Sequence, residues 1–274
     1  MRAEQWLKAA ADRLKGAGIG SARLDALILL EDLLRQDRAH LLAHPEIRLT
    51  PAQLKKLDKQ IARRVKHEPL AYIRGFSYFY GRKFKVNKRV LEPRPESETM
   101  IDLLKQIVVS QKSLVASQIK IVDVGTGSGC LGITAALELH NHNVDLFDID
   151  ANALGVARHN CELHELRLKV QKRDLLRNCH THYGVILANL PYVPTHFHIN
   201  EAAAREPRLA IFGGSDGLAV YRRLFEQLGH FSWQPKYMLT EALPPQHTKL
   251  AKIASASGFK QLKSQDFIQV FGSN

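Results

Sequence analysis

The chain has 274 residues, 45% of them hydrophobic and 24% charged, which suits a globular protein of two domains with a sizeable core. No apolar run approaches the roughly 20 residues that span a bilayer, residues 1–15 lack the apolar core of a signal peptide, and three scattered cysteines argue against a disulfide framework. We therefore expect a cytoplasmic protein without membrane contact, and its formal net charge of +12 favours an acidic or polyanionic partner.

Residues 1–75 are predicted to form a small helical domain. Apolar residues recur at helical spacing before and after residues 17–20, whose two glycines end the first helix. Another helix is expected from Thr50 and Pro51, a capping hydroxyl followed by proline at the first helical position. Because the domain contains no set of residues that suggests chemistry, we expect it to dock a substrate or to act as a scaffold.

Positive charge is concentrated in residues 55–94, which contain 13 Lys or Arg against 3 Asp or Glu. Charge runs are often no more than a solvated helix face. The alternative is a docking surface for an acidic protein or for RNA. The sequence leaves both interpretations open.

Residues 76–95 are expected to link two domains, because the aromatic run 76–86 with Gly81 at its centre predicts a β-hairpin. Residues 96–274 then form a second, larger domain that opens with a helix at 96–109. Strand-like apolar runs and helical stretches alternate there, which predicts a doubly wound, mostly parallel, Rossmann-like α/β sheet. Its last two strands should pair antiparallel. Seven strands are predicted, at 119–124, 143–149, 166–171, 183–189, 235–241, 259–263 and 267–271.

A glycine-rich loop follows the first of these strands and opens a helix. Glycine lets the backbone approach a ligand closely, and a helix N-terminus favours a carboxylate or phosphate. Because ligands of such sheets bind at the carboxyl ends of the strands, the loop is predicted to bind a nucleoside cofactor. Its residues are Asp123, Val124, Gly125, Thr126, Gly127, Ser128 and Gly129.

The loop alone does not identify the cofactor. Gly127, Gly129 and Gly132 satisfy the GxGxxG pattern of dinucleotide-binding folds, and Asp148 lies about 20 residues further on. Asp148 ends the second strand, where a carboxylate can accept both ribose hydroxyls of NAD or of S-adenosylmethionine. A surface acid is the alternative.

The segment Asn189-Leu190-Pro191-Tyr192 follows the fourth strand, again at its carboxyl end. The Asn189 side-chain oxygen and the Leu190 carbonyl can accept both hydrogens of an NH2 group, with Pro191 fixing the backbone. Tyr192 can stack on a planar amide or base. Two such acceptors would orient the nitrogen lone pair toward a sulfonium methyl group.

A proline-containing turn capped by asparagine is the other interpretation of this segment. A dehydrogenase has no need of it, so the segment and the glycine loop together favour an S-adenosylmethionine-dependent methyltransferase. No metal is expected, because transfer from a sulfonium needs none. The paired histidines, at 140/142, 180/182 and 196/198, fall in different predicted loops.

Four blocks resemble the HemK/PrmC-type protein-glutamine N5-methyltransferases, and the resemblance spans nearly the whole chain. One block is the glycine loop, which many methyltransferases share. The specific ones are residues 68–75 (EPLAYIRG), 90–98 (VLEPRPESE) and 206–217 (EPRLAIFGGSDG). The resemblance implies methyl transfer from S-adenosylmethionine to the side-chain amide nitrogen of the glutamine in the Gly-Gly-Gln motif of a peptide-chain release factor.

The resemblance also implies residue roles. Asp148 would hold the ribose, Asp174 would lie near the adenine with Leu175 beside the ring, and residues 94–98 would close over the cofactor. The substrate glutamine would be held by the catalytic residues Asn189, Leu190, Pro191 and Tyr192. The cofactor-binding residues expected on this basis are Asp123, Gly125, Thr126, Gly127, Ser128, Gly129, Asp148, Asp174, Leu175 and Asn189.

The chain departs from the family pattern at three points. Leu190 replaces the first proline of the usual Asn-Pro-Pro-Tyr, a change that preserves the backbone carbonyl. Glycine often follows the glutamate that matches Glu241, whereas residues 242–245 here read Ala-Leu-Pro-Pro. The C-terminal end is short and lacks the usual arginine.

Two other functions stay open. Ribosomal RNA adenine N6-dimethyltransferases also carry Asn-Leu-Pro-Tyr, and positive charge suits RNA. Those enzymes place their helical domain after the catalytic one, whereas here it comes first. A binding module without turnover is the non-enzyme alternative, and it would bind cofactor without transferring a methyl group.

Overall fold

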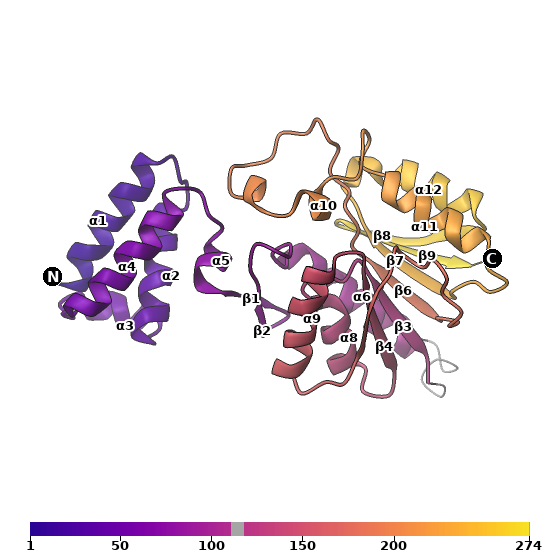
Figure 1. Cartoon of the computed structure of the whole chain (residues 1–274), viewed down its shortest axis with the longest axis horizontal. Helices are drawn as coiled ribbons and strands as arrows, with labels where there is room; N and C mark the ends of the chain where they lie inside the picture. The colour runs from indigo at the N-terminus through magenta and orange to yellow at the C-terminus, as the bar shows by residue number, and fades with distance from the viewer. Residues whose placement is uncertain (111–117, 274) are drawn as a thin grey trace. The chain divides into compact units, whose positions relative to one another are not determined.

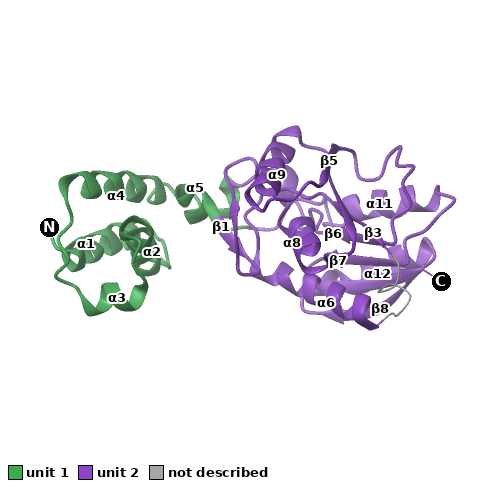
Figure 2. Cartoon of the chain, turned by 90° about the horizontal axis from the view of Figure 1, so that it is seen from below, with its two compact units in different colours: residues 1–76, 199–205 green, residues 77–198, 206–274 purple. Residues whose placement is uncertain are grey.

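The computed structural model describes residues 1–110 and 118–273. The chain divides into two compact units, residues 1–76 with 199–205 and residues 77–198 with 206–274 (Figure 2). Within the first unit, Oε2 of Glu201 in the segment 199–205 lies 3.0 Å from Nε2 of His67. This division differs from the predicted boundaries in that one short segment of the larger domain packs with the helices, which chain order alone does not reveal.

The first unit is a cluster of helices around a small apolar core. Its fourth helix begins at the predicted signal, where Thr50 Oγ1 accepts from the Gln53 N–H and Gln53 Oε1 accepts from the Thr50 N–H. The third helix has only six residues, too few for a periodic pattern, and the sequence did not predict it. The helices are α1 (Ala3–Gly16), α2 (Ala22–Leu34), α3 (Arg38–Ala43), α4 (Pro51–Arg64) and α5 (Leu70–Arg74).

A buried ion pair joins two of these helices. Arg64 of α4 donates through Nε to Oδ2 of Asp25 in α2 at 2.7 Å, and the two residues are only 8% and 4% exposed. Arg64 also donates to the Glu68 carbonyl oxygen at 3.2 Å. Removing either partner would leave the other charge buried without compensation.

The predicted hairpin is confirmed as β1 (Phe76–Phe79) and β2 (Arg82–Lys85), which pair in a two-stranded sheet. Asn160 of α9 (Ala151–Leu163) holds this hairpin through Lys85, whose N–H it accepts at 2.8 Å and whose carbonyl it donates to at 3.0 Å. The Asn160 Nδ2 also donates to the Ser128 carbonyl at 2.8 Å. One buried side chain therefore joins the hairpin to the glycine loop.

The second unit is built on a seven-stranded sheet with the order β5-β4-β3-β6-β7-β9-β8. Neighbouring strands are parallel except at β9, which pairs antiparallel with both β7 and β8. The doubly wound, mostly parallel fold and the antiparallel final pair are thus confirmed. The strands are β3 (Lys120–Val124), β4 (Asn143–Asp148), β5 (Lys169–Lys172), β6 (Val185–Ala188), β7 (Tyr237–Glu241), β8 (Phe259–Gln265) and β9 (Ile268–Ser273).

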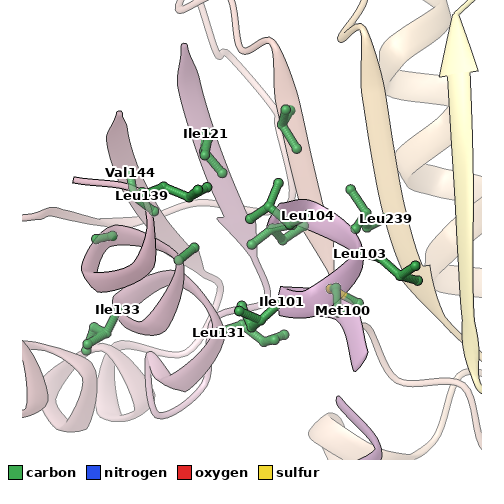
Figure 3. Packing of buried hydrophobic residues seen from close by; sticks show 14 of the residues in the cluster. Met100, Ile101, Leu103, Leu104, Ile121, Leu131, Ile133, Leu139, Val144 and Leu239 are labelled. Atoms are coloured by element: carbon green, nitrogen blue, oxygen red, sulfur yellow. The ribbon is translucent and has the colours of Figure 1, made fainter. Parts of the chain in front are cut away.

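Helices cover both faces of this sheet (Figure 1). On one face α6 (Glu98–Ser110), α8 (Cys130–Glu138) and α9 enclose a core that includes Ile121, and Figure 3 shows side chains of α6 and α8 against β3 and β7. On the other face α11 (Ala219–Gly229) and α12 (His247–Ala256) enclose a core that includes Val122. Successive strand residues therefore alternate between two cores.

The remaining helices are short. The predicted helix at 96–109 begins as the 3-10 turn η1 (Pro95–Ser97) before α6. The others are η2 (Ala203–Arg205), α10 (Arg208–Ile211) and η3 (Pro244–Gln246). Among the described residues, no helix is both long and apolar enough to cross a membrane.

Asp25→Ala is expected to lower the free energy of unfolding of the helical unit by about 3–5 kcal/mol, because it strands a buried guanidinium. Asp58→Ala is the matched control, since its partner Arg13 lies 3.5 Å away and both side chains are more than half exposed. That loss should stay below about 1 kcal/mol. Urea unfolding followed by circular dichroism measures both, and equal losses would contradict a structural role for the buried pair.

Candidate active site

The carboxyl ends of β3, β4 and β6 surround a pocket at the point where the strand order reverses. β3 lies between β4 and β6, so the chain crosses there from one half of the sheet to the other. Ligands of doubly wound sheets bind at this position. Residues 125–128, Asp148 and residues 189–191 all line the pocket.

The glycine loop presents backbone to the pocket. The N–H groups of Gly125 and Thr126 both donate to the Phe147 carbonyl at 2.9 Å, which ties the loop to the end of β4. A Cβ on Gly125 would lie 2.8 Å from Cδ2 of Leu190. Gly125 also has a φ of 76°, which disfavours any side chain. Glycine at this position therefore suits both the backbone conformation and the close approach of the loop to Leu190.

Asp123 supports the loop from behind. Its Oδ2 accepts from Thr126 Oγ1 at 2.6 Å and from the Gly132 N–H at 2.9 Å, and the residue is 1% exposed. Its Oδ1 has no hydrogen-bond partner among the described residues. Burial raises the pKa of Asp123 from 3.8 to about 6.

Asp148, in contrast, lines the pocket. Its Oδ2 accepts from the Gly127 N–H at 2.8 Å and its Oδ1 accepts from the Asp150 N–H at 2.9 Å. Burial raises its pKa, and the backbone hydrogen bonds oppose that rise. Because each carboxylate oxygen can accept a further hydrogen bond, this side chain can bind a diol.

Asp174 and Leu175 line the same pocket after β5. Oδ2 of Asp174 lies 2.5 Å from a guanidinium nitrogen of Arg223 in α11. Leu175 is 7% exposed. This wall therefore offers an apolar surface beside an ion pair.

Asn189 follows β6 directly and lies beside Glu241, the last residue of β7. The parallel register pairs Ala188 with Thr240, so the next residue on each strand is a neighbour of the other. Asn189 Nδ2 donates to Glu241 Oε2 at 2.9 Å and to Ser97 Oγ at 3.0 Å. The NH2 end of Asn189 therefore faces these two acceptors, which leaves the Asn189 Oδ1 to accept from a ligand.

Glu241 accepts two further hydrogen bonds. Ser97 Oγ donates to its Oε2 at 2.5 Å, and the Tyr192 hydroxyl donates to its Oε1 at 3.0 Å. Glu241 is 1% exposed, and burial raises its pKa while the donated hydrogen bonds oppose the rise. The carboxylate thus connects three residues from two separate blocks of the sequence.

The block 206–217 supports the backbone of the Asn189 segment. The Val193 N–H donates to the Ile211 carbonyl at 3.0 Å, and the Gly213 N–H donates to the Val193 carbonyl at 2.9 Å. A Cβ on Gly217 would lie 2.0 Å from the Tyr192 carbonyl oxygen. This block therefore needs glycines, because its backbone packs too closely against neighbouring atoms to leave room for a side chain.

Arg94 joins its own sequence block, 90–98, to the block 206–217 at the wall of the pocket. One guanidinium nitrogen donates to Glu206 Oε1 at 2.7 Å, and another lies 3.8 Å from Glu92. Arg94 and Ser97 both line the pocket. The part of residues 94–98 that faces the ligand site is therefore held by a carboxylate from block 206–217.

The structure places most of the predicted site residues in one pocket. Asp123, Gly129 and Tyr192 do not line it. Ten predicted residues do: Gly125, Thr126, Gly127, Ser128, Asp148, Asp174, Leu175, Asn189, Leu190 and Pro191.

The sequence analysis did not identify Ser97 and Glu241 as partners of Asn189, although Ser97 belongs to the block 94–98 that was expected to close over the cofactor. Their signals were the block 90–98 and the position of Glu241 at the end of a predicted strand. The pocket contains no histidine. The described residues also hold no group of three or more His, Cys, Asp or Glu side chains that could bind a metal ion.

This fold and site define a methyltransferase. Residues 5–75 match the family model of the PrmC N-terminal domain, and residues 97–206 match that of the methyltransferase small domain. The release factor glutamine methyltransferase of Coxiella burnetii is 32% identical over 253 residues, which cover 88% of this chain and 86% of that protein. The chain belongs to the release factor glutamine methyltransferase family.

Other similar proteins are also methyltransferases by name. The release factor glutamine methyltransferase of Koribacter versatilis is 35% identical over 233 residues, covering 83% of this chain and 81% of that protein. The chain is also 31% identical to the bifunctional methyltransferase of Rickettsia bellii, of which it spans 51%.

Solved structures share the fold. A methyltransferase from Pyrococcus furiosus superposes with a TM-score of 0.51 at 15% identity, covering 78% of this chain and 96% of that one. A 16S rRNA N2 G1207 methyltransferase from T. Thermophilus gives a TM-score of 0.51 at 13% identity, covering 73% of this chain and 49% of that one.

Asp123→Asn is expected to remove part of the pH dependence of stability. The folded state holds a proton on Asp123 up to about pH 6, whereas the unfolded carboxyl loses it near 3.8. The free energy of unfolding that this proton contributes is therefore fully present below about pH 4 and is lost as the pH rises through 6. Between pH 5 and 7.5 the wild type should lose about 1 kcal/mol more than the variant.

Urea unfolding of both proteins at pH 5 and pH 7.5 gives this difference directly. The control is Asp145→Asn, since Asp145 accepts from the Tyr183 hydroxyl at 2.5 Å on the same sheet. A change between the two pH values that is identical in wild type and Asp123→Asn would show that Asp123 does not titrate there.

Proposed function

We propose that this chain transfers the methyl group of S-adenosylmethionine to the side-chain amide nitrogen of the glutamine in the Gly-Gly-Gln motif of a peptide-chain release factor. The observation that carries the proposal is the orientation of Asn189, whose side-chain NH2 group donates toward Ser97 and Glu241. Its remaining oxygen fits an NH2 group. The names of the curated relatives favour glutamine over an RNA base.

The pocket residues fit S-adenosylmethionine. Asp148 can accept both ribose hydroxyls, Leu175 offers apolar contact for the adenine, and the glycine loop leaves room for close approach. The cofactor, when bound, supplies a methyl group made electrophilic by a positively charged sulfur.

The substrate nitrogen needs help from the protein, because the lone pair of an amide is delocalised into its carbonyl. Asn189 Oδ1 and the Leu190 carbonyl oxygen would accept its two N–H bonds and orient that lone pair. With the cofactor bound, the nitrogen would form the new bond to carbon, the electrons of the sulfur–carbon bond would remain on sulfur, and the nitrogen would then release a proton to solvent. Catalysis is positioning together with electrostatic stabilisation.

The helical unit is the proposed docking site for the release factor. Four lysines are exposed on α4 and just after it. The positive surface is narrower than the sequence suggests, because several basic side chains of residues 55–94 are already in ion pairs. Those side chains are Arg63, Arg64, Arg74, Arg82 and Arg94. The same lysines would attract RNA, which makes RNA the alternative partner.

Asp148→Ala is expected to weaken S-adenosylmethionine binding by roughly ten- to a hundredfold, since a hydrogen bond to a charged group contributes about 1.5–3 kcal/mol. Isothermal titration calorimetry measures the dissociation constant, with NAD as the ligand that should not bind. Asp145→Asn, on the same strand but outside the pocket, should bind normally. An unchanged constant for Asp148→Ala would mean that this carboxylate does not hold the ribose.

The methyl acceptor is tested by offering purified release factor and ribosomal RNA in parallel with labelled S-adenosylmethionine. Label should appear on the Gly-Gly-Gln peptide, located by mass spectrometry, and not on RNA. Label on an RNA adenine with the peptide unmodified would establish the adenine alternative. Cofactor binding without transfer to either substrate would establish a binding module.

A further inference from the structure

We propose that Glu241 is a positioning residue for the methyl acceptor: with Ser97 it accepts from the side-chain NH2 group of Asn189 and so turns Oδ1 toward the substrate. The proposal rests on the proposed function, since it explains how the Asn189 acceptor is oriented. Glu241 lies behind Asn189 and does not itself line the pocket.

An asparagine side chain needs such an orienting partner. Its oxygen and NH2 ends have nearly the same shape, so a half-turn about the last side-chain bond exchanges acceptor and donor. Glu241 removes this ambiguity, because a carboxylate can only accept hydrogen bonds. The NH2 end of Asn189 must therefore face Glu241, as the 2.9 Å contact shows.

The flipped orientation of the Asn189 side chain would be unfavourable at two contacts. Its oxygen would face Glu241 Oε2, leaving two acceptors in contact without a hydrogen between them. Its NH2 group would then face the substrate NH2 group, with two donors opposed. The orientation set by Glu241 is thus the one in which the site can receive a nitrogen that carries hydrogens.

Ser97 makes the orientation specific. Its hydroxyl oxygen accepts from Asn189 Nδ2 at 3.0 Å, and the hydroxyl donates its own hydrogen to Glu241 Oε2 at 2.5 Å. The three side chains form a closed triangle of polar contacts, with the NH2 end of Asn189 and the Ser97 hydroxyl both donating toward Glu241 Oε2. Ser97 and Glu241 are 2% and 1% exposed, so water does not compete for these bonds.

The same carboxylate also holds the other end of the acceptor segment. Its Oε1 accepts from the Tyr192 hydroxyl at 3.0 Å. Glu241 therefore fixes the first and the last residue of the segment 189–192 from one point on the neighbouring strand.

A double-mutant cycle tests the proposal. Glu241→Leu and Ser97→Ala are each made in the wild type and in Asn189→Ala, and kcat for release-factor methylation and the dissociation constant for S-adenosylmethionine are measured. Thr240→Val is the matched control, because Thr240 is fully buried beside Glu241 and its Oγ1 has no hydrogen-bond partner among the described residues.

In the wild-type background we expect kcat to fall about a hundredfold for Glu241→Leu and about tenfold for Ser97→Ala, with the dissociation constant within about threefold. In the Asn189→Ala background neither substitution should lower kcat by more than about threefold, because the group they orient is gone. Thr240→Val should leave kcat within about twofold. Losses that multiply fully in the Asn189→Ala background would overturn the proposal.

A second readout needs no substrate. The Asn189 side-chain amide protons, assigned in NMR spectra by their loss in Asn189→Ala, should exchange slowly in wild type and in Thr240→Val, and rapidly in Ser97→Ala. Rapid exchange in the wild type would overturn the role of Glu241 even where methylation is normal. Absence of release-factor methylation by a wild type with slow exchange would instead refute the proposed function alone. Ser97→Ala removes a single oxygen atom and is the smaller change. The exchange measurement can therefore still be made if Glu241→Leu does not fold.

Discussion

The parallel pairing of β6 with β7 is the constraint on which the site depends. It places Ala188 opposite Thr240, and therefore Asn189 beside Glu241 at the edge where both strands end. Successive residues of a strand point to opposite faces, so a slip of one residue would move one of these side chains to the other face of the sheet. The buried apolar residues on both faces of β6 resist such a slip, because it would exchange the members of two separate cores.

The site places several carboxylates in low-dielectric surroundings, and they are compensated to different degrees. Glu206 has an arginine at 2.7 Å, and Glu241 has three donors. Asp123 has two donors on one oxygen and none among the described residues on the other. Burial of a charge costs free energy unless hydrogen bonds or a counter-ion offset it. Among these three, the carboxylate beneath the glycine loop is thus the one with an oxygen that no described residue compensates.

The sequence predicted the sheet because each strand is a short apolar run, and it predicted the loop because glycines occur where a strand meets a helix. It could not predict the partners of Asn189, since Ser97 and Glu241 are 92 and 52 residues away and only the strand order brings them together. Asp123 was expected among the cofactor residues because it belongs to the loop motif, but its side chain turns inward to Thr126. A count of charges also overstated the free positive surface, because ion pairs depend on tertiary contacts.

Leu190 shows how a departure from a motif can be compensated locally. A proline at this position has no N–H, whereas leucine has a backbone N–H donor. Leu190 is only 2% exposed, so this donor is buried. A buried N–H without an acceptor would be costly. Here the Tyr221 hydroxyl oxygen accepts a hydrogen bond from that N–H, with the nitrogen and oxygen 3.3 Å apart. The same hydroxyl oxygen lies 2.6 Å from the Glu241 carbonyl oxygen. The Tyr221 hydroxyl therefore links backbone atoms of the segment 189–192 to backbone atoms at the end of β7. This link adds to the one made by the Glu241 side chain. The chain loses the rigidity of proline and keeps the Leu190 carbonyl in place through a hydrogen bond that proline could not make.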